Sequence, residues 1–334
     1  MSKHALLSAA VGICVTTVLG VLINQRGMFG PAAVGALISL CSLLFLYIFL
    51  GNPSFINKMK VWLNEGIWRK LLAPIPLLAA YLVYYFSTGE NTPIHILHML
   101  VYLYIPTILI MIVPTGLPKL TIWDMLFVLA IWVPIDFRLI QQVWHWPLAQ
   151  GAAAYLNTTG VCLTVILAVG IRQLDGVGYD FSLKITDWRN MNINLTLASI
   201  FVLPAGFLLN FLRWEPVDIN ILNIIGTFGG IMLAVAIPEE LFFRGIIQNL
   251  LSKSIHNQNL ALVLASIIFG IGHFNNAAYP GGPIPDWRYI LFASIAGLFY
   301  GRCYIQAGQR ILPAALIHTV MDTMWIHLFR GATQ

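Results

Sequence analysis

Two adjacent carboxylates stand against one of the most apolar stretches of the chain. Residues 238–245 are PEELFFRG, and they follow the run ILNIIGTFGGIMLAVAI. Glu240 and Arg244 are four residues apart, so on a helix they share a face, and Arg244 is expected to keep Glu240 ionised and fixed. Glu239 lies about 100° round the helix from Glu240, so the two glutamates are expected to have different roles. Ionisable groups are costly inside apolar segments, which makes these residues functional candidates.

Further titratable side chains lie in apolar segments downstream. His273 ends the segment IIFGIGH, and His318 and Asp322 share a helix face in LIHTVMD because they are four residues apart. With a rise of 1.5 Å per residue, these side chains and Glu240 all lie roughly 10–20 Å from the same membrane side. Three helices thus bring their ionisable groups to a similar depth, which favours one shared site.

These residue types support two schemes for the hydrolysis of a carbonyl compound. In the first, a carboxylate beside a histidine takes a proton from water, and a second histidine with Asp322 faces the developing oxyanion. In the second, two histidines and one carboxylate, here His273, His318 and Glu239, bind a catalytic zinc or another divalent metal with one open position. Both schemes need the same residue types, so the sequence leaves both open.

The composition places these side chains in a membrane protein. Of the 334 residues, 59% are hydrophobic and 9% are charged, whereas a soluble domain carries about 25% charged residues. Since a helix needs about 20 apolar residues to cross the bilayer core, we expect an all-α, polytopic transmembrane helical bundle of about eleven spans. The expected spans are 5–24, 31–50, 71–86, 96–113, 120–137, 157–172, 196–212, 221–238, 260–274, 288–305 and 311–329.

The distribution of charge indicates orientation and argues against one class of partner. Lysine and arginine are scattered singly, so the net charge of +5 indicates positive loops at a membrane surface and no nucleic-acid groove. Cytoplasmic loops of membrane proteins carry an excess of these residues. If the spans alternate as expected, most of them fall on the side of the N-terminus. The sequence therefore predicts an integral, multi-pass protein with a cytoplasmic N-terminus.

Three motifs together resemble the CPBP family of intramembrane proteases. They are EExxxR at 239–244, FxxxH at 269–273 and HxxxN/D at 318–322, in this order on three expected helices. The family is also called the Abi or CAAX type II family, and it includes the CAAX prenyl endopeptidase. The resemblance covers roughly 173–330. We therefore expect a CPBP-type protease domain at 157–334, after N-terminal transmembrane helices of unknown role at 1–156.

The resemblance implies hydrolysis of a peptide bond within the membrane, in a membrane-anchored or lipidated protein or peptide. It implies that Glu239 and His273 activate the water. It also implies that His318 and the residue at 322 stabilise the oxyanion, with the second glutamate and the arginine of the first motif as structural partners. The family is labelled metalloprotease, and a metal-free glutamate mechanism is argued for it too. The candidate site residues are thus Glu239, Glu240, Arg244, His273, His318 and Asp322.

Position 322 departs from part of the family. It is aspartate here, where the prenyl endopeptidases have asparagine. An ionised aspartate would repel an oxyanion, so Asp322 is expected to be protonated, to orient His318 or to bind metal. The broader family allows aspartate, so the difference bears on mechanism and on prenylated substrates more than on membership.

Two other classes of protein compete with a protease. A transporter or channel whose carboxylates relay protons or ions would have an internal repeat with broken helices in both halves, and no matching pair is evident. A catalytically silent scaffold or immunity protein would tolerate loss of Glu239 or His273, yet the sequence retains every motif position. The sequence therefore favours an enzyme of the lipid bilayer that acts on membrane-anchored substrates.

Overall fold

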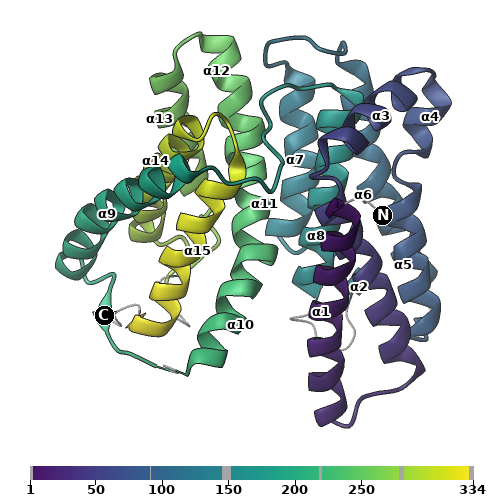
Figure 1. Ribbon diagram of the computed structural model, residues 1–334, viewed down its shortest axis with the longest axis horizontal. Helices are drawn as coiled ribbons and strands as arrows, with labels where there is room; N and C mark the ends of the chain where they lie inside the picture. The colour runs from purple at the N-terminus through teal and green to yellow at the C-terminus, as the bar shows by residue number, and fades with distance from the viewer. Residues whose placement is uncertain (1–2, 91, 145–151, 218–219, 278–281, 331–334) are drawn as a thin grey trace. The chain divides into compact units, whose positions relative to one another are not determined.

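The computed structural model describes residues 3–90, 92–144, 152–217, 220–277 and 282–330. This part of the chain is almost entirely helical (Figure 1), which confirms the all-α expectation. Its one sheet is an antiparallel pair of two-residue strands, β1 (Arg213–Trp214) and β2 (Phe329–Arg330). The chain forms two compact units, one of Met1–Leu117 with Thr121–Asp175 and one of Pro118–Leu120 with Gly176–Gln334.

The first unit is a helical bundle whose last helix is its most buried. Several of its helices begin at a proline, whose fixed φ and missing N–H suit the first turn. The helix that begins at Ala152 changes to π-type hydrogen bonding over Val165–Ile171. The elements of this unit are α1 (Lys3–Gln25), α2 (Pro31–Phe49), α3 (Pro53–Asn64), α4 (Ile67–Leu72), α5 (Ile75–Ser87), α6 (Pro93–Ile112), α7 (Ile122–Asp136), the 3-10 turn Gln141–Trp144 and α8 (Ala152–Thr164).

A buried ion pair stabilises the first unit. Arg172 and Asp124 are both about 1% exposed, and Arg172 Nε lies 3.1 Å from Asp124 Oδ1. The same guanidinium donates to the carbonyl oxygens of Pro114 and Leu117. Asp124 also accepts from the backbone N–H of Thr121, which closes a capping box at the start of α7. The charge that interrupts the expected span 120–137 is therefore paired and serves the start of a helix.

The second unit contains the three motifs. Helix α14 packs along α13, α9 and α15. A buried apolar cluster lies among α9, α14, β2 and the residues just before β1. Its members are Val202, Phe211, Leu212, Phe292 and Phe329. The elements of this unit are α9 (Ile185–Leu208), β1, α10 (Ile221–Ile231), α11 (Ile237–Glu240), α12 (Asn249–Ile255), α13 (Gln258–Ile271), α14 (Trp287–Gln306), α15 (Ile311–Leu328) and β2.

The glutamates lie in the middle of one long helix. Helices α10, α11 and α12 run end to end as a single helix over Ile221–Ile255 (Figure 1). The hydrogen-bond ladder is π-type over Met232–Ala236 and again over Leu241–Gln248, on either side of α11. Pro238 in α11 has no backbone N–H to give to that ladder. Short π-type segments inside α-helices are frequent at functional sites.

The expectation of about eleven membrane spans is not confirmed. A helix forms within every expected segment, but among the described residues eight helical segments are long and apolar enough to cross a membrane. Helices α7 and α13, with 15 and 14 residues, are too short. Helix α14 has 20 residues, but Arg288 and Arg302 lower its mean hydropathy. The cytoplasmic N-terminus stays a prediction. The expected domain boundary at 156 also stays a prediction, and the second compact unit resumes at Gly176.

Candidate active site

Four of the predicted side chains line one cavity in the second unit. The cavity has a volume of about 170 Å³, and its lining includes Glu239, His273, His318 and Asp322. Glu239 belongs to α11, His273 follows the end of α13, and the other two lie on α15. The similar depths inferred from helical rise therefore correspond to an actual juxtaposition.

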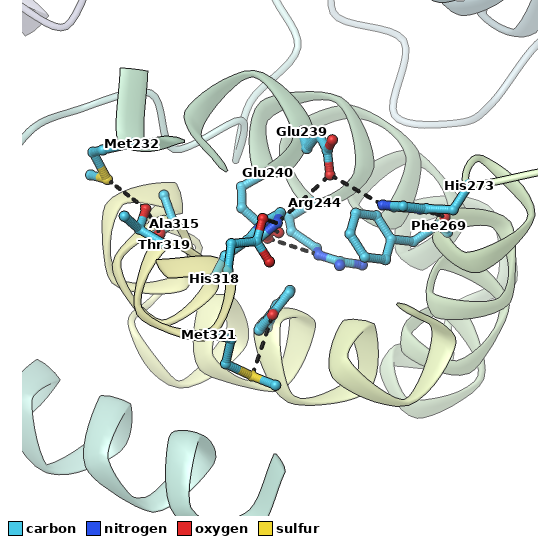
Figure 2. A network of polar contacts seen from close by, with 12 residues as sticks. Met232, Glu239, Glu240, Arg244, Phe269, His273, Ala315, His318, Thr319 and Met321 are labelled. Carbon is cyan, nitrogen blue, oxygen red and sulfur yellow. Dashed lines mark hydrogen bonds and ion pairs between the residues drawn. The ribbon is translucent and has the colours of Figure 1, made fainter. Parts of the chain in front are cut away.

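Glu239 lies between the two histidines, as Figure 2 shows. Its Oε2 atom is 3.8 Å from His273 Nε2 and 3.8 Å from His318 Nε2. Within the described part of the chain this oxygen accepts no hydrogen bond, and the Glu239 side chain is only 17% exposed. A carboxylate oxygen in this position has free lone pairs directed at the cavity. It is placed to accept a proton from a water molecule that also touches an imidazole.

The end of α13 fixes the orientation of His273. The backbone N–H of His273 donates to the Gly270 carbonyl, three residues back, at 3.0 Å. The Phe269 carbonyl, four residues back, is therefore left to accept from another donor. The His273 ring takes that place, with Nδ1 2.8 Å from the Phe269 oxygen. Because a carbonyl oxygen can only accept, Nδ1 carries the proton and Nε2 presents a lone pair in the neutral ring.

A buried carboxylate fixes the orientation of His318. His318 Nδ1 lies 3.0 Å from Glu240 Oε1, while its Nε2 lies 3.4 Å from Asp322 Oδ2. The Glu240 carboxylate accepts from Nδ1–H, so Nε2 of this ring also faces the cavity. A protonated His318 would donate from both nitrogens to acidic oxygens.

Glu240 and Arg244 lie behind His318. Both side chains are fully buried, and Arg244 Nε donates to Glu240 Oε2 at 2.9 Å. The guanidinium of Arg244 also stacks over the Phe269 ring at 4.7 Å. Neither Glu240 nor Arg244 is among the described residues that line the cavity. The arrangement forms a chain from Arg244 through Glu240 to His318, and the two glutamates face different surroundings.

Phe269, the aromatic residue of the second motif, separates the ionisable groups. Its ring meets His273 edge to face at 4.7 Å between centroids and His318 at 5.8 Å. With Arg244 on its face, Phe269 contacts a member of each motif. Its ring therefore packs against both imidazoles and the guanidinium.

Sequence reasoning missed the rest of the cavity wall. Most of the remaining lining is apolar or aromatic, and Ser199 and Asn276 add polar groups. Apolar residues on these helices look the same in sequence whether they face lipid, core or cavity, so the only available signal is helical periodicity. The apolar and aromatic lining outside the motifs is Val202, Leu203, Phe211, Leu212, Val235, Tyr289, Phe292, Ala293, Ala296, Tyr300, Met321, Met324, Trp325 and Phe329.

The two histidines share one feature of metal ligands. An imidazole whose Nδ1–H is held by a carbonyl or carboxylate and whose Nε2 is free is typical of zinc-binding histidines. Yet among the described residues no three His, Cys, Asp or Glu side chains are arranged so that they could hold a metal ion. The donor types suit zinc, but the arrangement does not form its ligand group.

The segment that carries these groups matches a known protein family. Residues 221–324 match the family model described as type II CAAX prenyl endopeptidase Rce1-like. The matched segment begins at α10 and contains all three motifs. The resemblance to the CPBP family drawn from those motifs is thereby confirmed. No curated protein and no solved structure matched the chain.

Proposed function

We propose that this chain, whose segment 221–324 matches the Rce1-like family model, is an intramembrane endopeptidase of the CPBP family. The family supports a CAAX-type protease, and eight candidate spans support an integral membrane protein that meets its substrates in the bilayer. The proposed reaction is hydrolysis of a peptide bond in a membrane-anchored or lipidated protein or peptide. The observation that carries it is Glu239 Oε2, which accepts no hydrogen bond within the described part of the chain and lies 3.8 Å from the Nε2 atoms of both histidines.

The first step is the attack of water. A water molecule held by Glu239 and His273 gives one proton to this pair, and its oxygen bonds the carbonyl carbon of the scissile peptide. The carbonyl π electrons move to the oxygen, which becomes an oxyanion. The proton then passes from the Glu239–His273 pair to the amide nitrogen. The oxyanion electrons re-form the carbonyl, and the carbon–nitrogen bond breaks with its electron pair leaving on the amine, so the products are a carboxylic acid and an amine. Both groups return to their starting state, so no covalent intermediate with the protein is required.

His318 supplies the charge that faces the oxyanion. With Nδ1–H held by Glu240, a protonated His318 donates from Nε2 towards the cavity. Preorganised donors aimed at a developing negative charge are usually the largest contribution to such reactions. Asp322 Oδ2 lies 3.4 Å from the same Nε2, and its side chain is 37% exposed. This geometry favours the orienting role for Asp322 among the three alternatives, because it stabilises the charged form of His318.

The test is cleavage by the purified protein in lipid nanodiscs, with a panel of lipidated and leader peptides analysed by mass spectrometry. Glu239→Gln and His273→Gln should each lower kcat by about 10²–10⁴-fold, the usual contribution of a positioned acid–base group. Glu215→Gln is the matched control, because Glu215 is a glutamate of the same unit, paired with Arg213 outside the cavity lining. Cleavage that survives both site variants would overturn the proposal.

A further inference from the structure

Helix α14 contributes two tyrosines to the candidate site, although none of the three motifs lies on it. Tyr289 and Tyr300 are about three helical turns apart, and their separation of eleven residues returns them to within about 20° of the same face. Both line the cavity with the ionisable groups. One face of α14 therefore carries an aromatic ring at each of two levels about 16 Å apart.

Each tyrosine ring stacks on a different histidine. The Tyr289 ring lies on His273, with 5.2 Å between centroids and 21° between planes. The Tyr300 ring lies on His318, with 4.7 Å and 16°. Both pairs are nearly parallel, whereas Phe269 meets both histidines edge-on. Each imidazole is thus held between a tyrosine face and the edge of one shared phenylalanine.

The tyrosines are themselves held in place. Tyr300 is 2% exposed, and its hydroxyl donates to Met321 Sδ at 3.3 Å. The Tyr289 ring packs edge-on against Phe211 at 5.8 Å and near Trp325 at 5.6 Å. The stacked rings are therefore fixed surfaces and not mobile side chains that follow the histidines.

Stacking supplies what one hydrogen bond cannot. A single bond at Nδ1 fixes one point of an imidazole but lets the ring turn about that bond, which would swing Nε2 away from Glu239. A parallel ring on the imidazole face removes this rotation. The negative face of an aromatic ring also attracts a cation, so the same contact favours a histidine while it carries a proton.

We propose that Tyr289 and Tyr300 are positioning residues that hold the two imidazoles by stacking, so that both Nε2 atoms point at Glu239 Oε2. The proposal rests on the proposed protease function and adds α14 to its machinery. Neither tyrosine exchanges a proton with substrate in this scheme, and the aromatic ring, not the hydroxyl, does the positioning.

The experiment compares ring removal with hydroxyl removal at both positions. Tyr289→Leu and Tyr300→Leu should each lower kcat about tenfold to 100-fold, since a small displacement of reacting groups can cost that much. Tyr289→Phe and Tyr300→Phe keep the ring and should stay within about threefold of wild type. Tyr304→Leu is the control, because Tyr304 is a buried tyrosine of the same helix whose hydroxyl bonds the Gly176 carbonyl.

A second measurement does not depend on activity. NMR of protein with labelled histidines, assigned with His273→Gln and His318→Gln, reports ring-current shielding of each imidazole by its tyrosine. The Leu variants should remove this shielding from the matching histidine only, and the Phe variants should keep it. Should no peptide be cut by wild type, the protease function fails while the NMR result still decides the stacking. Phe variants as impaired as the Leu variants, or unchanged histidine signals in the Leu variants, would overturn the positioning role.

Discussion

Replacing Glu240 by glutamine should lower both the free energy of unfolding and kcat, and a second substitution should restore only the first. Glu240 is fully buried and accepts two charge-assisted hydrogen bonds, from Arg244 Nε at 2.9 Å and His318 Nδ1 at 3.0 Å. Removing one partner of a buried ion pair costs about 3–5 kcal/mol, because the other charge is left uncompensated. Glu240→Gln strands the Arg244 guanidinium, so we expect the free energy of unfolding to fall by about this amount.

The double variant Glu240→Gln with Arg244→Met distinguishes the two roles. Replacement of a whole buried ion pair by groups of similar volume is often close to neutral, so the double variant should regain most of the lost stability. Its kcat should remain about 10²–10⁴-fold below wild type, because His318 still lacks the carboxylate that fixes its tautomer and charge.

Thermal unfolding in nanodiscs and peptide cleavage are the two assays. Gln248→Met is the control, since Gln248 is a buried polar residue of the same long helix that bonds the Gly301 carbonyl and lies outside the cavity lining. It should lose some stability and keep its kcat. A double variant with wild-type kcat would refute the positioning of His318 by Glu240. A double variant less stable than Glu240→Gln would refute the stranded charge as the cause of instability.

Three further predictions concern Asp322, the metal scheme and the buried pair of Asp124 with Arg172. Asp322→Asn should lower kcat roughly fivefold, because a partly exposed pair with His318 contributes about 1 kcal/mol; an unchanged or higher kcat in steady-state cleavage would contradict the orienting role. Treatment with a chelator, followed by metal analysis, should leave cleavage unchanged, whereas stoichiometric zinc lost together with activity would restore the metal scheme for Glu239. Asp124→Asn should lower the thermal stability of the protein by about 3–5 kcal/mol, because it strands the buried Arg172; an unchanged unfolding temperature would count against a structural role for this pair.

The sequence predicted the parts of the site that depend on single helices. The axial depth of a side chain and the face shared by residues four apart follow from helix geometry alone, so Glu239, His273 and His318 could be assigned to one level before any contact was known. Which nitrogen faces which oxygen depends on tertiary packing. The hydrogen bond of His273 Nδ1 forms because the last turn of α13 leaves the Phe269 carbonyl free to accept it. The stacking of Tyr300 on His318 joins α14, which carries no motif, to α15.

The fold was less predictable where a charge or a proline stands within an apolar run. Asp124 lies within an apolar run, yet Thr121 and Asp124 form a capping box that marks the start of α7. Its partner Arg172 lies 48 residues away and could not be inferred from spacing. The expected count of about eleven spans is not confirmed, because length and apolarity were judged from residue runs, whereas among the described residues α7 and α13 form helices of only 15 and 14 residues.

The π-type ladder on both sides of α11 decides how the long helix would respond to the loss of a single residue. Each π-type stretch bonds residue i to i+5, and so accommodates more residues per turn than an α-helix does. Deletion of one residue from Leu241–Gln248 would remove the extra residue of the π-type stretch and let the ladder return to the α pattern, so the residues that follow would keep nearly the same orientation relative to Glu239. The same deletion in a regular α-helix would rotate everything that follows by about 100°. Composition and hydropathy would hardly change. A single-residue deletion within Leu241–Gln248 should therefore disturb the orientation of α12 relative to the carboxylates of α11 less than a deletion in a regular α-helix would.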